Sequence, residues 1–233
     1  MHTLTLYELL FAFIPAAIVI AVMIYQSLQY KTALYAMARM VLQLLLIGYF
    51  LIYLFEAETS AVILLTLGVM LIAAGWISLR TVEQKRNALF IKSIISIGVG
   101  GGLTLILVTQ VVIGLDPWYQ PSYMIPLAGM IFANTMTAIS IAAERLSHDL
   151  SNDIPYHQAS TQAYNAALIP VINGLFAVGL VSLPGMMTGQ ILSGVSPLIA
   201  ARYQIMVMAM IFGASGLSVL LFLKLAKSNF SSK

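Results

Sequence analysis

The sequence predicts an all-α membrane protein with about seven transmembrane helices. Of its 233 residues, 61% are hydrophobic and only 8% are charged, whereas about a quarter of the residues in a soluble domain are charged. Apolar stretches of about 20 residues, the length that crosses a bilayer as a helix, recur along the whole chain. No ten-residue segment alternates as a membrane β-strand does. We therefore expect one transmembrane domain, residues 1–233, embedded in the lipid bilayer.

Seven segments are long and apolar enough to span. They are 6–27, 36–55, 61–79, 93–113, 123–143, 166–183 and 202–225. The sixth is expected to stop at Pro184-Gly185, because proline and glycine do not continue a helix. Helices are expected throughout, since an open sheet edge cannot face lipid.

The distribution of charge predicts an outer N-terminus and a cytosolic C-terminus. Cytosolic loops of membrane proteins are enriched in Lys and Arg. One set of loops holds ten of them: Lys31, Arg39, Arg80, Lys85, Arg86, Lys92, Arg145, Lys224, Lys227 and Lys233. The opposite side holds only Arg202. It carries instead the acidic residues Glu8, Glu56, Glu58 and Asp116.

The longest cytosolic connection, residues 144–165, is predicted to be a coupling loop. It is polar without being strongly basic, and four alanines favour helix within or beside it: Ala159, Ala163, Ala166 and Ala167. One interpretation is a short helix that lies on the membrane surface and docks a partner. The other is an ordinary connector.

The fifth predicted span carries a polar stripe. At 100° per residue, Asn134, Thr137, Ser140 and Glu144 fall within about 120° of one another. Such side chains face either a lumen or a neighbouring helix, where each interhelical hydrogen bond contributes about 0.6–2 kcal/mol. Both interpretations stay open for this stripe.

Polar and sulfur-containing residues are concentrated between residues 154 and 201, where no residue is formally charged. Pro170 has no N–H, so it leaves a backbone carbonyl near Asn173 without its helical hydrogen bond. The segment after Pro184-Gly185 is uncharged but contains polar and sulfur-containing residues. Its notable residues are Met186, Met187, Thr188 and Gln190. Because such groups persist at membrane depth mainly beside protein or water, this segment is a re-entrant constriction or an outer loop.

The seventh span places Tyr203, Met206, Met210 and Gly213 on one face. Methionine is either a soft ligand or a filler of gaps in packing. His148 and His157 lie nine residues apart, which matches no metal-ligand spacing. No metal site is assigned.

Glycine spacing in the fourth span predicts close helix packing. Gly98 and Gly102 form a GxxxG pair, and small residues at that spacing let two helices approach closely.

The motif inventory excludes the common enzyme classes. The sequence contains no GxxxxGK[ST] phosphate loop, no HExxH and no GxSxG. Carboxylates lie in loops or at helix ends, which disfavours a proton-coupled carrier with a buried acid. We expect no catalytic residue, no cofactor bound by this chain and no nucleic-acid partner.

Several motifs together resemble uncharacterised protein family 14, which includes bacterial iron-export ABC transporter permeases and plant aluminium-tolerance permeases. The resemblance spans nearly the whole chain. The motifs are RMVLQL at 39–44, IPLAGM at 125–130, NTM at 134–136, ERL at 144–146, IPVIN at 169–173, GLVSLPGMMTGQIL at 179–192 and RYQ at 202–204. Members of the family carry a longer segment between the ERL and IPVIN motifs. In this sequence the corresponding segment, residues 149–157, is short.

The resemblance implies a permease subunit in the bacterial inner membrane that pairs with itself and with a separate cytosolic ABC ATPase, which uses the ATP. Glu144, Arg145 and His148 are the implied contacts with that ATPase. The implied cargo is a metal, iron first, or a nucleotide sugar as in plant relatives. A self-sufficient channel or carrier, and a purely structural subunit, remain as alternatives. The candidate translocation path consists of Asn134, Thr137, Asn173, Met186, Met187, Thr188, Gln190, Tyr203 and Gln204.

Overall fold

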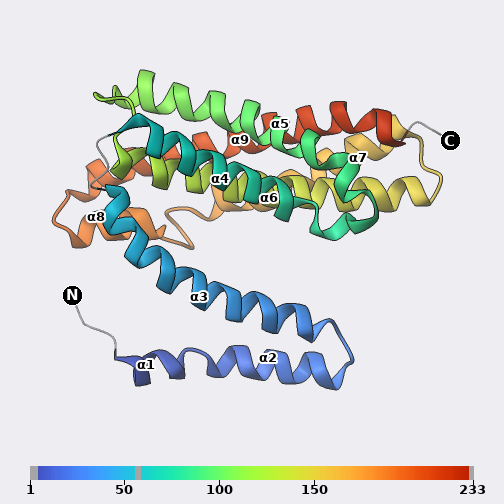
Figure 1. Cartoon of the computed structure of the whole chain (residues 1–233), viewed down its shortest axis with the longest axis horizontal. Coiled ribbons are helices and arrows are strands. Elements are labelled where there is room, and N and C mark those ends of the chain that lie inside the picture. Colours follow the sequence, from blue (N-terminus) through green and yellow to red (C-terminus); the bar gives the residue numbers. More distant parts are fainter. Residues whose placement is uncertain (1–4, 56–58, 231–233) are drawn as a thin grey trace. The chain divides into compact units, whose positions relative to one another are not determined.

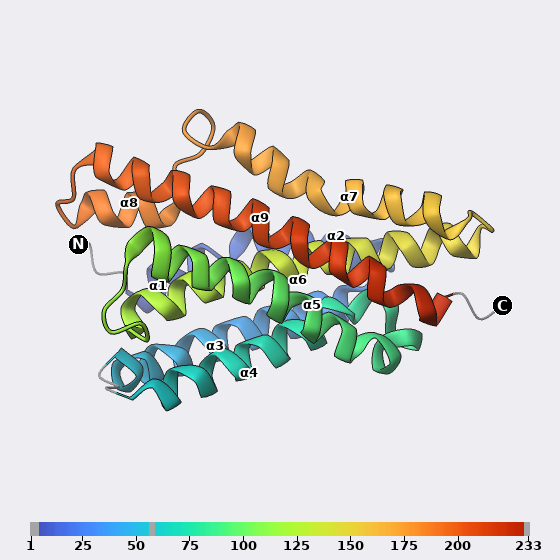
Figure 2. The same ribbon diagram turned by 90° about the horizontal axis from the view of Figure 1, so that it is seen from above.

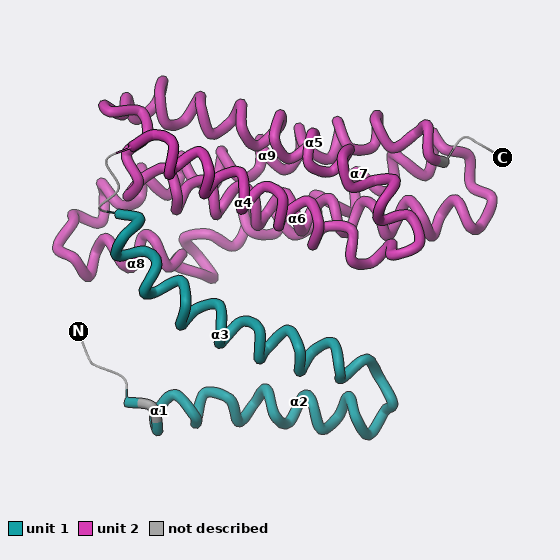
Figure 3. The backbone as a smooth tube through the Cα atoms, in the orientation of Figure 1, with its two compact units in different colours: residues 1–56 teal, residues 57–233 magenta. Residues whose placement is uncertain are grey.

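The computed structural model describes residues 5–55 and 59–230. The described residues form two compact units, Met1–Glu56 and Ala57–Lys233, which are coloured separately in Figure 3. Three charges used to predict the orientation, those of Glu56, Glu58 and Lys233, lie outside the described residues.

The first unit is a helical hairpin. It consists of α1 (Leu6–Phe11), α2 (Ile14–Tyr25) and α3 (Tyr30–Phe55). Thr5 begins α1 with a capping box, in which its backbone N–H donates to Glu8 Oε2 at 2.7 Å. The predicted first span is interrupted between α1 and α2. Pro15, the second residue of α2, has no N–H that could donate to the preceding turn.

The second unit is a helical bundle (Figures 1 and 2). Its elements are α4 (Ser60–Ser78), the 3-10 helix η1 (Arg80–Lys85), α5 (Arg86–Ile106), the π-helix η2 (Leu107–Ile113), α6 (Pro121–Ser151), α7 (Tyr156–Ala177), α8 (Gly185–Leu192) and α9 (Pro197–Phe230). Helix α9 packs against α5, α6, α7 and α8. Helix α6 packs against α4, α5, α7 and α9, so α6 and α9 together form the centre of this unit.

A glycine of α5 lies close to a neighbouring helix, as the sequence predicts, and that helix is α9. The glycine is not one of the predicted pair, Gly98 and Gly102. A Cβ on Gly100 would lie 2.5 Å from Ser218 Oγ and 2.7 Å from the Ser218 backbone nitrogen. Gly102 faces open space, and a Cβ on Gly98 would make only an ordinary contact with Leu71. Helices α5 and α9 thus approach closely at Gly100, which lies between the two predicted glycines.

The helices confirm the predicted fold class. Within the described residues, six helices are long and apolar enough to cross a membrane. Helix α7 is not among these six, but it runs antiparallel to α9. The Tyr156 hydroxyl near its start donates to the carbonyl of Leu223 at 2.5 Å, and Gly174 near its end approaches Met208.

The segment predicted as a loop at 144–165 is helical except for the turn at 152–155. Residues 144–151 continue α6, and residues 156–165 form the first turns of α7. The turn uses Asp153 in the left-handed region, at φ 59°. Two transmembrane helices therefore extend beyond the apolar spans and meet in a tight hairpin.

Helix α7 ends earlier than the sequence predicts. The expected end is Leu183, whereas the last helical residue is Ala177. Gly179 has φ 84°, a conformation that glycine adopts readily and other residues rarely do, and it turns the chain before Pro184 is reached. The helical path resumes at α8.

Candidate functional site

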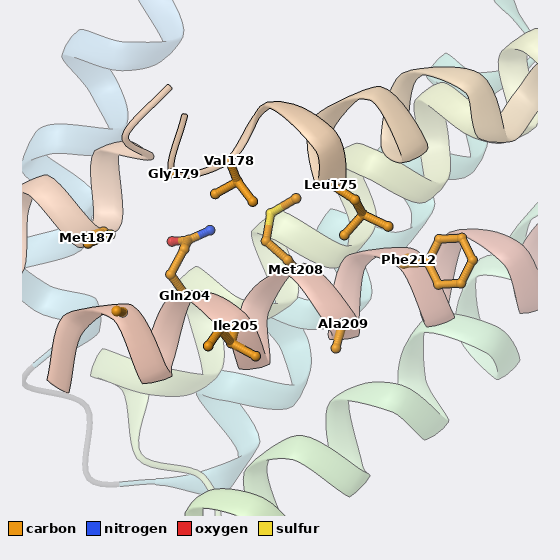
Figure 4. Close-up of a pocket in the computed structure, with 10 residues that line it drawn as sticks. Leu175, Val178, Gly179, Met187, Gln204, Ile205, Met208, Ala209 and Phe212 are labelled. Carbon is orange, nitrogen blue, oxygen red and sulfur yellow. The ribbon is translucent and has the colours of Figure 1, made fainter. Parts of the chain in front are cut away.

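A cavity of about 520 Å³ lies between the end of α7, the helix α8 and the outer half of α9 (Figure 4). We call it the outer cavity. It is lined by Leu175, Val178, Gly179, Met187, Ala201, Gln204, Ile205, Met208, Ala209 and Phe212. All of these residues belong to the second unit.

The break between α7 and α8 forms one side of the outer cavity. After Ala177 the chain makes a short loop in which the Gly179 N–H donates to the Ser182 carbonyl at 3.0 Å. Helix α8 then packs against the start of α9 and carries Met187 to the cavity. The irregular backbone thus lies beside a cavity, as expected for non-helical segments in membranes.

Gln204 is the polar side chain of the outer cavity. The residue is 6% exposed, and its Oε1 atom is buried without a hydrogen-bond partner in the described structure. Figure 4 shows its amide and the Met208 thioether projecting from α9 toward Val178 and Leu175. An unsatisfied buried acceptor costs about 1–3 kcal/mol. Gln190, Ser215 and Ser218 also carry such an atom, but of these residues only Gln204 lines the outer cavity.

The depth of the outer cavity follows from the helix rise. At 1.5 Å per residue, Gln204 lies about 3 Å and Phe212 about 15 Å inward from Arg202, the cation at the outer end of α9. A hydrocarbon core is about 30 Å thick. The outer cavity therefore occupies the half of α9 nearer to Arg202, which is the outer half in the orientation that the charge distribution predicts.

The lining of the outer cavity is neutral. It offers one amide oxygen and the sulfur atoms of Met187 and Met208, with apolar groups around them. In the described part of the chain, no three His, Asp or Glu side chains come together as a metal site would require. The lining can therefore coordinate a soft or neutral ligand only weakly.

Of the nine predicted path residues, Met187 and Gln204 line the outer cavity. Three others bond within their own helices. Asn134 Nδ2 donates to the Met130 carbonyl at 2.8 Å, Thr137 to Ala133 at 2.9 Å, and Thr188 to Pro184 at 2.9 Å. This pairing four residues back is a local alternative to interhelical bonding.

The remaining four predicted path residues lie outside the lining. Gln190 has a buried Oε1 without a hydrogen-bond partner, as Gln204 has. Asn173 is exposed on α7, and Met186 and Tyr203 are half-buried. Their part in a path stays a prediction.

The outer cavity is also lined by three apolar residues that were not predicted, Leu175, Met208 and Phe212. Apolar side chains of this kind occur throughout the chain, so composition gives no signal for them. The spacing of Gln204, Met208 and Phe212 at four-residue intervals would place them on one face of α9. That spacing was the available clue.

The predicted ATPase contacts lie near the hairpin between α6 and α7. Arg145 Nε donates to Asp149 Oδ2 at 2.9 Å, and its Nη2 donates to Gln162 Oε1 of α7 at 2.8 Å. His148 Nδ1 lies 3.5 Å from Asp149 Oδ1. The Asp149 side chain is 2% exposed, whereas that of Arg145 is 46% exposed. The buried Asp149 thus contacts two of the three predicted residues, Arg145 and His148, and the third, Glu144, is exposed on α6.

The helices and the outer cavity define a multi-pass α-helical membrane protein with a neutral, largely apolar cavity. The sequence profile of the uncharacterised protein family UPF0014 matches residues 6–156 and 155–230. The chain belongs to this family, as the motifs predict. The two matches meet at the α6–α7 hairpin, at residues 155–156.

Curated relatives agree with this assignment. The chain is 37% identical over 202 residues to the UPF0014 membrane protein slr1647 of Synechocystis, covering 80% of this chain and 78% of that protein. It is 33% identical over 206 residues to the probable iron export permease protein FetB of Escherichia coli, covering 82% and 78%. It is 33% identical over 239 residues to the protein ALUMINUM SENSITIVE 3 of Arabidopsis thaliana, covering 91% and 86%. No solved structure gives a significant match.

Proposed function

We propose that this protein is the permease subunit of an ABC transporter of the bacterial inner membrane and that it exports a metal ion, iron first. Two copies of the chain work with a separate cytosolic ATPase. The name of the Escherichia coli relative supports the cargo. The lack of a phosphate loop in the sequence supports an external source of energy.

The observation that carries the proposal is the buried amide oxygen of Gln204 in the outer cavity, which has no hydrogen-bond partner in the described structure. A polar group left without a partner in an apolar chamber binds a passing polar ligand with no competing internal hydrogen bond. Because the lining is neutral, the cargo is held weakly and released easily. A high-affinity cage of carboxylates or imidazoles would instead retain the metal.

An exposed polar group on α7 supports the pairing of two copies. Asn173 is exposed there, whereas the exposed Thr137 hydroxyl on α6 already donates to the Ala133 carbonyl. Polar side chains within membranes face a protein interior or a water-filled path, since lipid offers them no hydrogen bond. A second copy of the chain is expected to cover Asn173. The exposed Glu144 and the fixed Arg145 and His148 form the surface for the ATPase.

Transport by vesicles tests the role of Gln204. The complex with its ATPase is prepared in inverted membrane vesicles, and ATP-dependent uptake of iron is compared with that of other metals and a nucleotide sugar. Gln204→Leu keeps the volume and removes the amide. We expect iron transport to fall about tenfold, which corresponds to about 1.4 kcal/mol, because the variant removes the amide oxygen of the lining that can coordinate a metal ion. The thermal unfolding midpoint should be unchanged or higher, since a buried unsatisfied group is removed.

Gln110→Leu is the matched control. Gln110 is an exposed amide of η2 whose Nε2 donates to Thr109 Oγ1 at 3.2 Å, and it does not line the outer cavity. The control should transport like the native protein. Native rates in Gln204→Leu would contradict the assigned path, and uptake without ATP would indicate a self-sufficient channel or carrier.

A further inference from the structure

A second concavity lies at the cytosolic end of the bundle, between the first turns of α7 and the last turns of α9. We call it the cytosolic groove. It has a volume of about 430 Å³. Figure 2 shows the two helix ends at the same end of the second unit. The outer cavity lies at the opposite end of the same two helices.

The charge of the cytosolic groove has one sign. Lys224 and Lys227, one helical turn apart on α9, line it together with His157 of α7. None of its lining residues is acidic. The field inside the groove therefore favours an anion.

Hydroxyl groups lie opposite the lysines. Ser160 Oγ and Thr161 Oγ1 each donate to the His157 carbonyl at 3.0 Å, so both hydroxyls now bond within their own helix. A hydroxyl hydrogen rotates about its C–O bond, so either group can donate to a ligand oxygen instead. Ammonium and hydroxyl donors around one space are the groups that bind a phosphate.

The position of the groove selects among phosphate-bearing ligands. Lys224 lies about 33 Å from Arg202 along α9, at 1.5 Å per residue, and a hydrocarbon core is about 30 Å thick. Lys224 therefore lies at the inner headgroup level. Leu220, one turn further into the membrane, also lines the groove and is 44% exposed. An apolar floor below a cationic rim fits a lipid, whose acyl chain continues where its headgroup ends.

From these observations we propose that the cytosolic groove binds the headgroup phosphate of an anionic phospholipid from the inner leaflet. Lys224 and Lys227 neutralise the phosphate, Ser160 or Thr161 donates to it, and Leu220 contacts the acyl chain. Basic pockets between transmembrane helices on the cytosolic side are suited to such headgroups. A bound lipid would hold the start of α7 against α9.

Native mass spectrometry and thermal unfolding of the purified full chain test this proposal. The protein in neutral detergent is titrated with phosphatidylglycerol, with zwitterionic phosphatidylcholine, and with soluble glycerol phosphate. We expect bound phosphatidylglycerol and a raised unfolding midpoint, with neither effect from the other two. The variant Lys224→Gln/Lys227→Gln should lose about 30-fold in affinity, which at 1.4 kcal/mol per tenfold equals about 1 kcal/mol per lysine.

Two further variants make the result specific. Lys224→Arg/Lys227→Arg keeps the charge and should retain the lipid. Arg80→Gln removes an exposed cation of η1 outside the groove and should bind as the native chain does. Equal binding of phosphatidylcholine, or competition by glycerol phosphate at similar concentration, would overturn the lipid assignment. Loss of ATPase binding in the double glutamine variant, with lipid binding unchanged, would show a protein-docking surface and overturn it as well.

Discussion

The contact between α5 and α9 at Gly100 gives a quantitative test of the bundle. Gly100→Ala adds one methyl group where the new Cβ would lie 2.5 Å from Ser218 Oγ, 2.7 Å from its backbone nitrogen and 2.9 Å from its Cα. The last two atoms are backbone, so a change of rotamer cannot relieve the clash. Either α5 or α9 must shift.

The matched variant is Gly102→Ala, two residues along the same helix, where a Cβ meets nothing within 4 Å. Both substitutions gain the same helix propensity, about 1 kcal/mol. Only Gly100→Ala also incurs overpacking, which costs about 1–3 kcal/mol. The difference between the two variants therefore isolates the clash. We expect Gly102→Ala to be slightly more stable than the native chain and Gly100→Ala to be less stable than Gly102→Ala by about 1–3 kcal/mol.

Heating the detergent-solubilised protein and measuring the remaining monodisperse fraction gives the unfolding midpoint. For a chain of this size, 1 kcal/mol shifts the midpoint by about 2–4 °C, so the two variants should differ by roughly 2–12 °C. Equal midpoints for the two alanine variants would refute the close approach of α5 and α9 at this glycine.

Two further predictions concern the cytosolic ends of the helices. Asp149→Asn removes the buried carboxylate that Arg145 contacts; it should destabilise the protein by about 1–3 kcal/mol and weaken ATPase co-purification, which a pull-down measures. Tyr156→Phe removes the hydrogen bond to the Leu223 carbonyl and should cost about 1 kcal/mol. Burial raises the pKa of Tyr156 to about 12, so the protonated hydroxyl contributes its full stability below pH 10 and loses it as the pH rises through about 12. The difference in midpoint between native and Tyr156→Phe should be constant from pH 7 to 10 and shrink above it; a difference that disappears by pH 10 would contradict the raised pKa.

Hydropathy was sufficient to predict six of the seven spans. A helix needs about 20 apolar residues to cross a bilayer, and stretches of this length can be recognised directly in the sequence. The ends of the helices were harder to place. Helix α7 ends at Ala177 because of the backbone angle of Gly179, and the sequence does not reveal which of several glycines adopts that angle.

The candidate site was predictable only where it is polar. Gln204 and Met187 stand out in an apolar chain, and both line the outer cavity. Asn134 stands out equally, yet its amide bonds to its own helix. Which polar groups turn inward depends on packing between segments distant in sequence. The glycine run shows the same limit, since Gly100 rather than Gly102 meets α9.

The hairpin between α6 and α7 has a mechanical consequence. From Tyr156 to Ala177 the chain is one helix of 22 residues, about 33 Å long, which joins the hairpin to the wall of the outer cavity. Pro170 lies inside this helix and removes one of its backbone hydrogen bonds, five residues before Leu175 of the cavity lining. A displacement of the turn at 152–155 would therefore move the cytosolic part of α7 as a unit, and Pro170 is the point at which the helix can bend before the motion reaches the cavity.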